Sequence, residues 1–297
     1  GQTGSSCFNS TSMTLPEVVG NRSQAALVYC AEQVRKHDHD RYLCSLFAPS
    51  RSRSALWALY ALNIELARTR EMVTQPMLGQ VRLKWWREAF EGLCEGEPPK
   101  HMVVEALALS WPSIWTVQNY FLSLIDARMV DLADRPLKTL EELERYLEAT
   151  SASLMELSLF ALNVNDAASK AAGREIGLAW GFIGLIRILP FRSASRQLCV
   201  PTSILSELGF SSAERCLGPS SILTRAVKII ADQAMDHLGI ARASVLEAPR
   251  AARAALSLGV LARLYLDRLA NADYNPYAAN FNVSSLRRLA KLGMSWR

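Results

Sequence analysis

The sequence has no long apolar stretch that is free of charge. Spanning a bilayer takes ~20 consecutive apolar residues. Arg187 and Arg192 interrupt the apolar segment around Ile183, and Arg242 interrupts the one that follows Ile229. The sequence therefore predicts a soluble protein or one that lies on a membrane surface.

Several signatures of enzymes and metal-binding proteins are also missing. There is no Gly-rich phosphate loop, no Gly-x-Ser-x-Gly and no His-Glu-x-x-His. The 6 cysteines lie far apart, with no Cys-x-x-Cys pair. This spacing disfavours a zinc site and predicts free thiols in a reducing compartment.

Charge is low and evenly spread. The 33 Lys and Arg residues exceed the 28 Asp and Glu residues by a formal +5. Nucleic-acid-binding proteins usually carry a basic stripe with interleaved aromatic residues, whereas Arg51 and Arg53 lead directly into the apolar segment 55–60. We expect no nucleic-acid partner, while an anionic membrane surface or an acidic partner stays open.

The first residues, 1–12, are rich in Gly, Ser, Thr and Asn and contain no acidic residue. They also lack the apolar core of a secretory signal. We interpret residues 1–23 as a flexible N-terminal extension. Two origins fit this composition, the remainder of an organellar presequence or an ordinary disordered tail.

Helical periodicity dominates the rest of the sequence, and strand-like alternation is nearly absent. Connections are short and no linker divides the chain, which predicts one all-α domain over residues 24–297. Thr139 and Glu142 form a capping-box pattern at one helix start. The predicted helices cover 24–36, 51–70, 79–93, 111–132, 140–147, 153–162, 167–189, a short segment between Pro201 and Gly209, 223–246, 250–270 and 284–292.

Paired carboxylates are the first candidates for a metal site. Asp131 with Asp134, and Asp232 with Asp236, have the spacing that places two acids on one helix face. A solvated helix face explains such pairs more often than a metal does.

Two further polar clusters have structural explanations. Asp38 and Asp40 stand just before a helical segment, where acids form turns or caps. Trp85 and Trp86, beside Arg82, could stack on a ligand, but at least one of the two rings is expected to pack in the core.

Ordered blocks of the sequence resemble the squalene/phytoene synthase family. This resemblance covers most of the chain from residue 24 onward and implies a single-domain, isoprenoid-synthase-like helical bundle. The blocks that carry it are Asp38–Leu43, Leu46–Pro49, Ala58–Arg68, Pro76–Glu88, Leu178–Gly181, Arg187, Val200–Pro201, Tyr265–Leu269 and Ser285–Leu289.

Catalytic members of that family use two aspartate-rich motifs on facing helices, which hold Mg²⁺ against prenyl diphosphates. The resemblance puts the acids of the first motif at or near Ala67, Arg68 and Glu71, of which only Glu71 is a carboxylate. The first motif is therefore degenerate.

The second motif would follow Arg187, with its acids at about Ile188 and Arg192. Neither is a carboxylate. No Asp or Glu occurs anywhere from Ile176 through Ser206, so no shift of register restores the pair. The resemblance thus implies a pseudoenzyme without catalytic residues, metal or cofactor.

Arginine at these positions reverses the charge of the ancestral site. Arg68 and Arg192 would repel Mg²⁺, although cations there could still bind a bare diphosphate or another anion. A remaining lipid or anion pocket would involve Tyr60, Arg82, Trp86 and Arg187.

One non-catalytic branch of the family fits better than its biosynthetic enzymes. Asn63–Ala67, Arg187–Pro190 and Arg196–Pro201 resemble the mitochondrial complex I assembly factor 6 group. That resemblance implies a mitochondrial protein on the matrix side of the inner membrane. Its partners would be subunits or assembly intermediates of respiratory complex I, and its role transient assembly or permanent residence as an accessory subunit.

Two other functions stay open. An active Mg²⁺-dependent prenyltransferase would need displaced acids such as Glu65, Asp126 or Asp131 to converge on one metal. A lipid- or isoprenoid-binding protein without turnover shares most features with the assembly role, and the sequence does not separate the two.

The C-terminal segment, Ser284–Arg297, combines apolar residues with Arg and Lys, as helices at a membrane interface do. This composition predicts peripheral contact with inner-membrane lipids. An equally good interpretation is a terminal helix that docks on the protein's own core.

Overall fold

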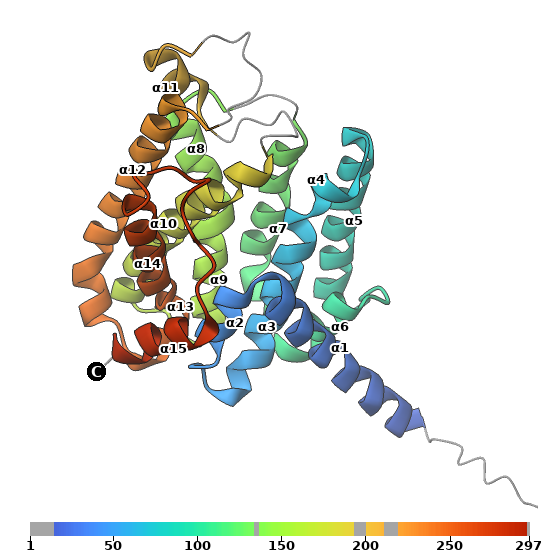
Figure 1. The fold of residues 1–297 in the computed structure, drawn as a ribbon. Coiled ribbons are helices and arrows are strands. Elements are labelled where there is room, and N and C mark those ends of the chain that lie inside the picture. The colour runs from blue at the N-terminus through green and yellow to red at the C-terminus, as the bar shows by residue number, and fades with distance from the viewer. Residues whose placement is uncertain (1–14, 134–136, 193–199, 211–218, 296–297) are drawn as a thin grey trace, which may run out of the picture.

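Every regular element in the residues that the structure describes is helical. The computed structural model describes residues 15–133, 137–192, 200–210 and 219–295 (Figure 1). The all-α prediction is confirmed. Helix α1 (Leu15–His37) begins earlier than the predicted residue 24. The flexible extension stays a prediction, and residues 1–14 lie outside the described part.

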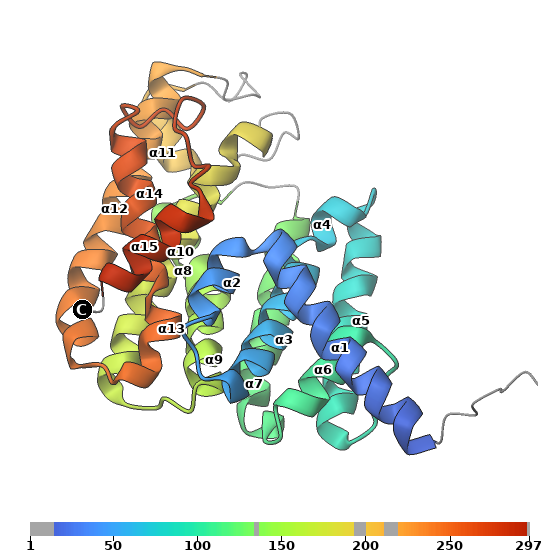
Figure 2. The same cartoon turned by 60° about the horizontal axis from the view of Figure 1, so that its bottom comes forward.

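The N-terminal half is built around three helices that contact one another, α1, α3 (Ser50–Ala67) and α6 (Met102–Ser110). Helix α5 (Pro76–Glu95) packs on α7 (Gln118–Ala127). Figures 1 and 2 both show α5 at one outer edge of the molecule.

The C-terminal half is built around α10 (Ala167–Arg192), which packs most extensively against α12 (Ser221–Glu247). The same helix also contacts α9 (Ser153–Ala161), α14 (Leu258–Ala270) and the π-helix η3 (Glu148–Ala152). The remaining short elements are α2 (His39–Ser45), α4 (Thr69–Met72), η1 (Ile114–Val117), η2 (Arg128–Leu132), α8 (Leu140–Leu147), α11 (Thr202–Glu207), η5 (Arg250–Ala252), α13 (Arg253–Leu256) and α15 (Ser285–Met294).

Local signals place several helix ends. The hydroxyl oxygen of Thr139 accepts a hydrogen bond from the N–H of Glu142 at 3.2 Å, so the predicted capping residue begins α8. The carboxylate of Glu142 reaches back to the N–H of Lys138 at 2.8 Å, one residue before the cap. Helix α5 begins with Pro76 and ends at Gly96, whose φ of 90° suits glycine.

Several predicted helix boundaries are wrong. The segment 111–132 divides into η1, α7 and η2, and the segment 250–270 divides into η5, α13 and α14. Ser257 lies where α13 ends and α14 begins. Its hydroxyl donates to the carbonyl of Arg253 at 2.5 Å, and a bond of this kind bends helices. The sequence predicts an interruption at Pro190, but α10 continues to Arg192.

Helix α6 was missing from the predicted elements. Its sequence is apolar on most sides, with Val103, Val104, Ala106 and Leu107 all buried. Periodicity does not distinguish a short buried helix from other buried segments, because it has no polar face.

The buried side chains form one hydrophobic core that includes Trp86, Phe121, Phe182 and Tyr265. Among the cysteines in the described part, Cys30, Cys44 and Cys94 are free thiols, as predicted. Within the same residues, no helix combines the length and the apolar character that crossing a bilayer requires.

A close backbone contact joins α10 to the π-helix. A Cβ atom added to Gly177 would lie 2.6 Å from Cα of Ala152 and 3.1 Å from the carbonyl oxygen of Ser151. The Ser151 hydroxyl donates to the carbonyl of Gly177 at 2.6 Å. Only a residue without a side chain permits this approach, so Gly177 fixes how α10 lies on η3.

Gly177→Ala is expected to lower the free energy of unfolding by about 1–3 kcal/mol, because backbone atoms of η3 must move to admit the methyl group. Gly184→Ala is the matched control on the same helix, since nothing lies within 4 Å of its added Cβ. That change should raise stability by about 0.5–1 kcal/mol through helix propensity. Urea denaturation of both variants measures the difference, and equal effects would contradict the close contact.

Candidate functional site

The carboxylate of Asp40, in the first turn of α2, lies buried between helices from both ends of the chain. Asp38 begins α2 and accepts a hydrogen bond from the N–H of Arg41 at 3.4 Å. The capping interpretation is therefore confirmed for Asp38. It is wrong for Asp40, whose residue is only 5% exposed and whose side chain bonds to distant helices.

Three donors converge on Asp40. Arg288 of α15 donates to Oδ1 at 2.6 Å, and the Tyr265 hydroxyl of α14 donates to the same oxygen at 2.8 Å. Arg187 of α10 donates to Oδ2 at 3.0 Å. Both carboxylate oxygens are therefore engaged, and the contacts join α2 to α10, α14 and α15.

These donors decide the charge state of the cluster. Burial raises the pKa of Asp40, but the charge of Arg187 and the hydrogen bonds from Arg288 and Tyr265 outweigh it. The net result is a pKa below the ordinary value of 3.8. Burial, together with the charge of Asp40, raises the pKa of Tyr265 to about 12. At neutral pH the carboxylate is therefore ionised and the phenol is a donor.

Aromatic rings line the same cluster. The guanidinium carbon of Arg187 lies 4.3 Å from the ring centroid of Tyr265 and 5.9 Å from that of Trp180. Arg41 lies 5.6 Å from the centroid of Tyr60 and pairs with Asp38 at 2.7 Å. Contact with aromatic faces stabilises guanidinium groups that are partly removed from water.

The degenerate first motif lies at the end of α3 and in α4. Ala67 is the last residue of α3 and is partly buried. Arg68 is exposed at the C-cap, where its N–H donates to the carbonyl of Ile64 at 3.1 Å. Glu71 is exposed in α4. The remaining carboxylate of this motif therefore stands in solvent.

The degenerate second motif lies at the end of α10. Arg187 bonds to Asp40, and Ile188 is partly buried. Arg192 is the last residue of α10, and its side chain lies outside the described part. The assignment of all these positions as a former metal site stays a prediction.

The residues predicted to form a remaining lipid or anion pocket have separate partners. Tyr60 is buried beside Arg41, and burial raises its pKa to about 12. Arg82 pairs with Glu65 at 2.5 Å, and Arg187 pairs with Asp40. Trp86 is 1% exposed, so its ring packs in the core as expected, whereas Trp85 is 39% exposed. A pocket shared by the predicted residues stays a prediction.

The acids that an active prenyltransferase would need are paired with cations. Glu65 accepts from Arg82, and Asp126 accepts from Arg87 at 2.6 Å. Asp131 accepts from the Tyr146 hydroxyl at 2.6 Å and from Arg128 at 3.3 Å. In the part of the chain that the structure describes, no group of three or more His, Cys, Asp or Glu side chains could hold a metal ion.

The two carboxylate pairs with helical spacing were the other candidates for a metal site. Asp232 and Asp236 are exposed on α12, and Asp232 pairs with Lys228 at 2.7 Å. These acids therefore form a solvated face, as expected. Asp134, the proposed neighbour of Asp131, lies outside the described residues.

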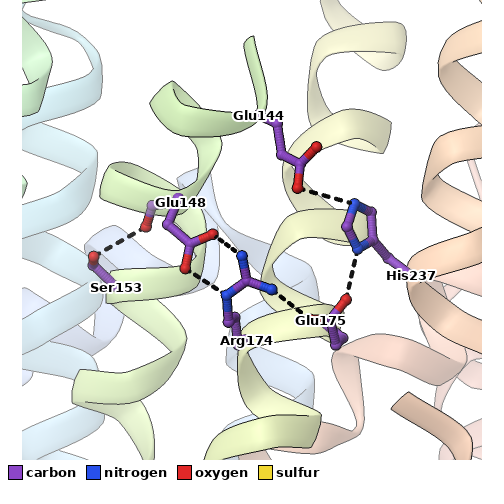
Figure 3. A network of polar contacts seen from close by, with 6 residues as sticks. All are labelled: Glu144, Glu148, Ser153, Arg174, Glu175 and His237. Atoms are coloured by element: carbon purple, nitrogen blue, oxygen red, sulfur yellow. Dashed lines mark hydrogen bonds and ion pairs between the residues drawn. The ribbon is translucent and has the colours of Figure 1, made fainter. Parts of the chain in front are cut away.

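A second polar network, shown in Figure 3, joins α8, η3, α10 and α12. Arg174 bonds to Glu148 through two nitrogens and to Glu175 at 2.6 Å. The other Glu175 oxygen contacts Nδ1 of His237 at 2.6 Å, and both of these side chains are buried. Nε2 of His237 lies 3.9 Å from Glu144. This network ties elements together, and periodicity alone did not indicate it.

A cavity of about 340 Å³ lies elsewhere, between α5, α7 and η2. Exposed apolar side chains of Met77 and Val81 form one wall, and Met129 lies on another. The ion pair between Arg87 and Asp126 stands in its lining. None of the residues predicted for a lipid or anion pocket lines this cavity.

Asp40→Asn is expected to lower the free energy of unfolding at neutral pH by about 3 kcal/mol, because the change removes the counter-charge of two partly buried guanidinium groups. The folded-state pKa of Asp40 lies below its ordinary value of 3.8. The stabilisation is therefore complete above that value and is lost as pH falls through the folded-state pKa.

Urea denaturation from neutral pH down to about pH 3 measures both effects. The original chain should lose more stability than Asp40→Asn as pH falls below about 4. Asp232→Asn, at an exposed pair, is the control and should cost less than about 1 kcal/mol. Parallel acid limbs for the original chain and Asp40→Asn would contradict the assigned ionisation.

The chain is similar in sequence to proteins of one family. A family model described as squalene/phytoene synthase matches residues 34–295. A protein of Rattus norvegicus named NADH dehydrogenase (ubiquinone) complex I, assembly factor 6 is 31% identical over 272 residues, which cover 91% of this chain and 82% of that protein. The Homo sapiens protein of the same name is 29% identical, covering 91% of this chain and 81% of its own length. A chloroplastic phytoene synthase of Narcissus pseudonarcissus is 23% identical, covering 90% of this chain and 65% of its own length.

Solved structures show the same fold. A dehydrosqualene synthase superposes with a TM-score of 0.80 at 18% identity, over 92% of this chain and 96% of that one. A squalene synthase of Alicyclobacillus acidocaldarius superposes with a TM-score of 0.74 at 18% identity, over 86% of this chain and 97% of that one. The predicted isoprenoid-synthase-like bundle is confirmed. The chain belongs to the squalene/phytoene synthase family, in the branch of the relatives named complex I assembly factor 6.

Proposed function

We propose that this chain is a non-catalytic mitochondrial protein that serves respiratory complex I as an assembly factor or accessory subunit. The observation that carries this proposal is the similarity, over 91% of the chain, to proteins named as complex I assembly factor 6. The more distant relatives named as phytoene synthases are only 23% and 21% identical.

The charges of the site support a role without catalysis. The family chemistry implied by the sequence needs free carboxylates that hold Mg²⁺. The described acids considered for that task are instead paired with arginines or exposed, and the sequence from Ile176 through Ser206 contains no acid. Arg68 and Arg192, at positions where the resemblance places acids, would add repulsion between the site and a metal ion.

The composition of helix α15 supports the proposal of peripheral contact with a membrane surface, which for a complex I protein would be the matrix side of the inner membrane. Leu292 is fully buried, whereas Leu286 and Met294 are 80% and 60% exposed. Arg287 and Lys291 are exposed between these apolar residues, and no acid follows Asp273 in the sequence. The inner face therefore docks on the core, and the outer face has the composition of a membrane-interface helix.

A gentle-detergent extract of mitochondria from the source cells tests the proposed partner. The tagged chain should co-migrate with complex I subunits or with a smaller assembly intermediate, as identified by mass spectrometry. Abundance equal to that of complex I would indicate an accessory subunit, and substoichiometric abundance an assembly factor. Migration without any complex I subunit would contradict the proposal.

The purified chain should release no diphosphate from farnesyl or geranylgeranyl diphosphate in the presence of Mg²⁺. The triple variant Arg68→Asp, Ile188→Asp, Arg192→Asp should also stay inactive, because a metal site needs supporting hydrogen bonds in addition to the acids themselves. Phosphate-release and product assays measure both. Turnover by the original chain would overturn the non-catalytic proposal, whereas turnover by the triple variant alone would show that the rest of the site is intact.

Arg287→Gln and Lys291→Gln are each expected to weaken binding to vesicles containing anionic phospholipid by about fivefold, because one basic residue near such a surface contributes ~1 kcal/mol. Flotation or co-sedimentation measures the bound fraction. Leu286→Asp should weaken binding as well. Leu246→Asp, on a leucine that is 82% exposed on α12, is the matched control. Equal loss in both leucine variants would contradict a membrane role specific to α15.

A further inference from the structure

The groups around Asp40 have the composition of an anion-binding site. Two guanidinium groups and a phenol hydroxyl, from three different helices, point donors at one small volume. Guanidinium groups are the preferred protein ligands of carboxylates and phosphates, and charge-assisted bonds of this length are strong. The anion that they hold is part of the chain itself.

The site is well shielded from solvent. The side chain of Asp40 is 6% exposed, that of Arg288 is 13% exposed, and that of Arg187 is 30% exposed. Because two partly buried cations face a single carboxylate, the cluster keeps an excess positive charge. Without the Asp40 carboxylate, both guanidinium groups would be partly desolvated and would lack a counter-charge.

A second observation shows that the carboxylate does not use every donor. Nε of Arg288 is buried and has no hydrogen-bond partner among the described residues. Asp40 accepts two of its bonds at Oδ1 and one at Oδ2, and none of them comes from Nε of Arg288. An anion with more oxygens, such as a phosphate, matches the number of donors better than a carboxylate does.

We propose that Arg187, Arg288 and Tyr265 form an anion-binding site whose permanent occupant is this chain's own Asp40, and that residue 40 decides whether an external phosphate can enter. The native chain then binds no free diphosphate at this place. When the carboxylate is removed, the same three donors take a phosphate or diphosphate anion. This inference goes beyond the complex I role and does not depend on it.

The test uses Asp40→Ala, which removes the internal anion and leaves space for an external one. Inorganic pyrophosphate is titrated at constant ionic strength, and binding is followed by the melting temperature and by the phosphorus NMR line width. We expect the melting temperature of Asp40→Ala to start below that of the original chain and to rise with pyrophosphate. The original chain should show no such rise. The affinity of the variant for pyrophosphate should exceed that of the original chain by about tenfold or more, the factor that corresponds to ~1.4 kcal/mol.

Three controls separate a specific site from general charge effects. Asp38→Ala removes a neighbouring carboxylate that pairs with Arg41 and should not acquire the response. Asp40→Asn loses the charge but still fills the space, so pyrophosphate should rescue it poorly. Adding Arg187→Gln to Asp40→Ala should abolish the response, because it removes one of the three donors.

Two results would overturn the proposal. One is an equal pyrophosphate response in the original chain and Asp40→Ala, and the other is no response in either. If Asp40→Ala does not accumulate in folded form, Asp40→Ser supplies the same comparison with a small residue that keeps an acceptor. If neither folds alone, refolding yield is compared with and without pyrophosphate. A yield that pyrophosphate does not raise would count against the site.

Discussion

A buried carboxylate needs donors, and in this bundle the donors of Asp40 come from far along the chain. Arg187, Tyr265 and Arg288 stand 147, 225 and 248 residues away in sequence. Because an uncompensated charge in such a place costs several kcal/mol, the helices that carry these residues are held in fixed positions relative to α2. The short helix α15 is part of this constraint, since Arg288 bonds to Asp40 and Leu292 is buried in the core.

The same constraint determines what chemistry the interior can support. A metal-dependent synthase needs acids whose oxygens are free to coordinate a cation. Here Asp40 accepts hydrogen bonds from three donors, and Glu65, Asp126 and Asp131 each pair with an arginine. These acids are therefore not free to coordinate a metal ion. What is left for interaction lies on the outside, where apolar residues are exposed on α5 and on the outer face of α15.

The sequence correctly predicted several features of the structure that depend on residues close together along the chain. The helix start at Thr139 and the cap at Asp38 follow from side chains that bond within three residues. The family blocks identified the fold, which periodicity alone did not define beyond an all-helical domain. The buried helix α6 and the division at Ser257 were not predicted, because neither leaves a mark in the spacing of apolar residues.

The role of Asp40 was not predictable for a related reason. Two acids before a helix are a familiar cap pattern, and nothing near residue 40 in the sequence distinguishes the acid that caps from the acid that is buried. The difference is set by Arg187, Tyr265 and Arg288, which the sequence places in three unconnected segments. Arg187 was expected among the residues of a former metal site, yet its observed partner lies on α2. The sequence therefore indicated that Arg187 belongs to the site, but it did not indicate the ion pair between Arg187 and Asp40.

The contacts that stabilise the fold differ from those at the predicted former metal site. The approach of α10 to the π-helix at Gly177, and the apolar core around Phe121 and Phe182, involve no acid of either degenerate motif. Loss of carboxylates at the predicted motif positions would therefore leave those contacts in place, and an exposed residue such as Glu71 contributes little to the core. Function in this architecture follows from the groups placed at the site and on the surface, because the packing beneath accepts either chemistry. In this chain the carboxylate at the site is occupied by internal donors, and exposed apolar and basic residues lie on the outer face of α15.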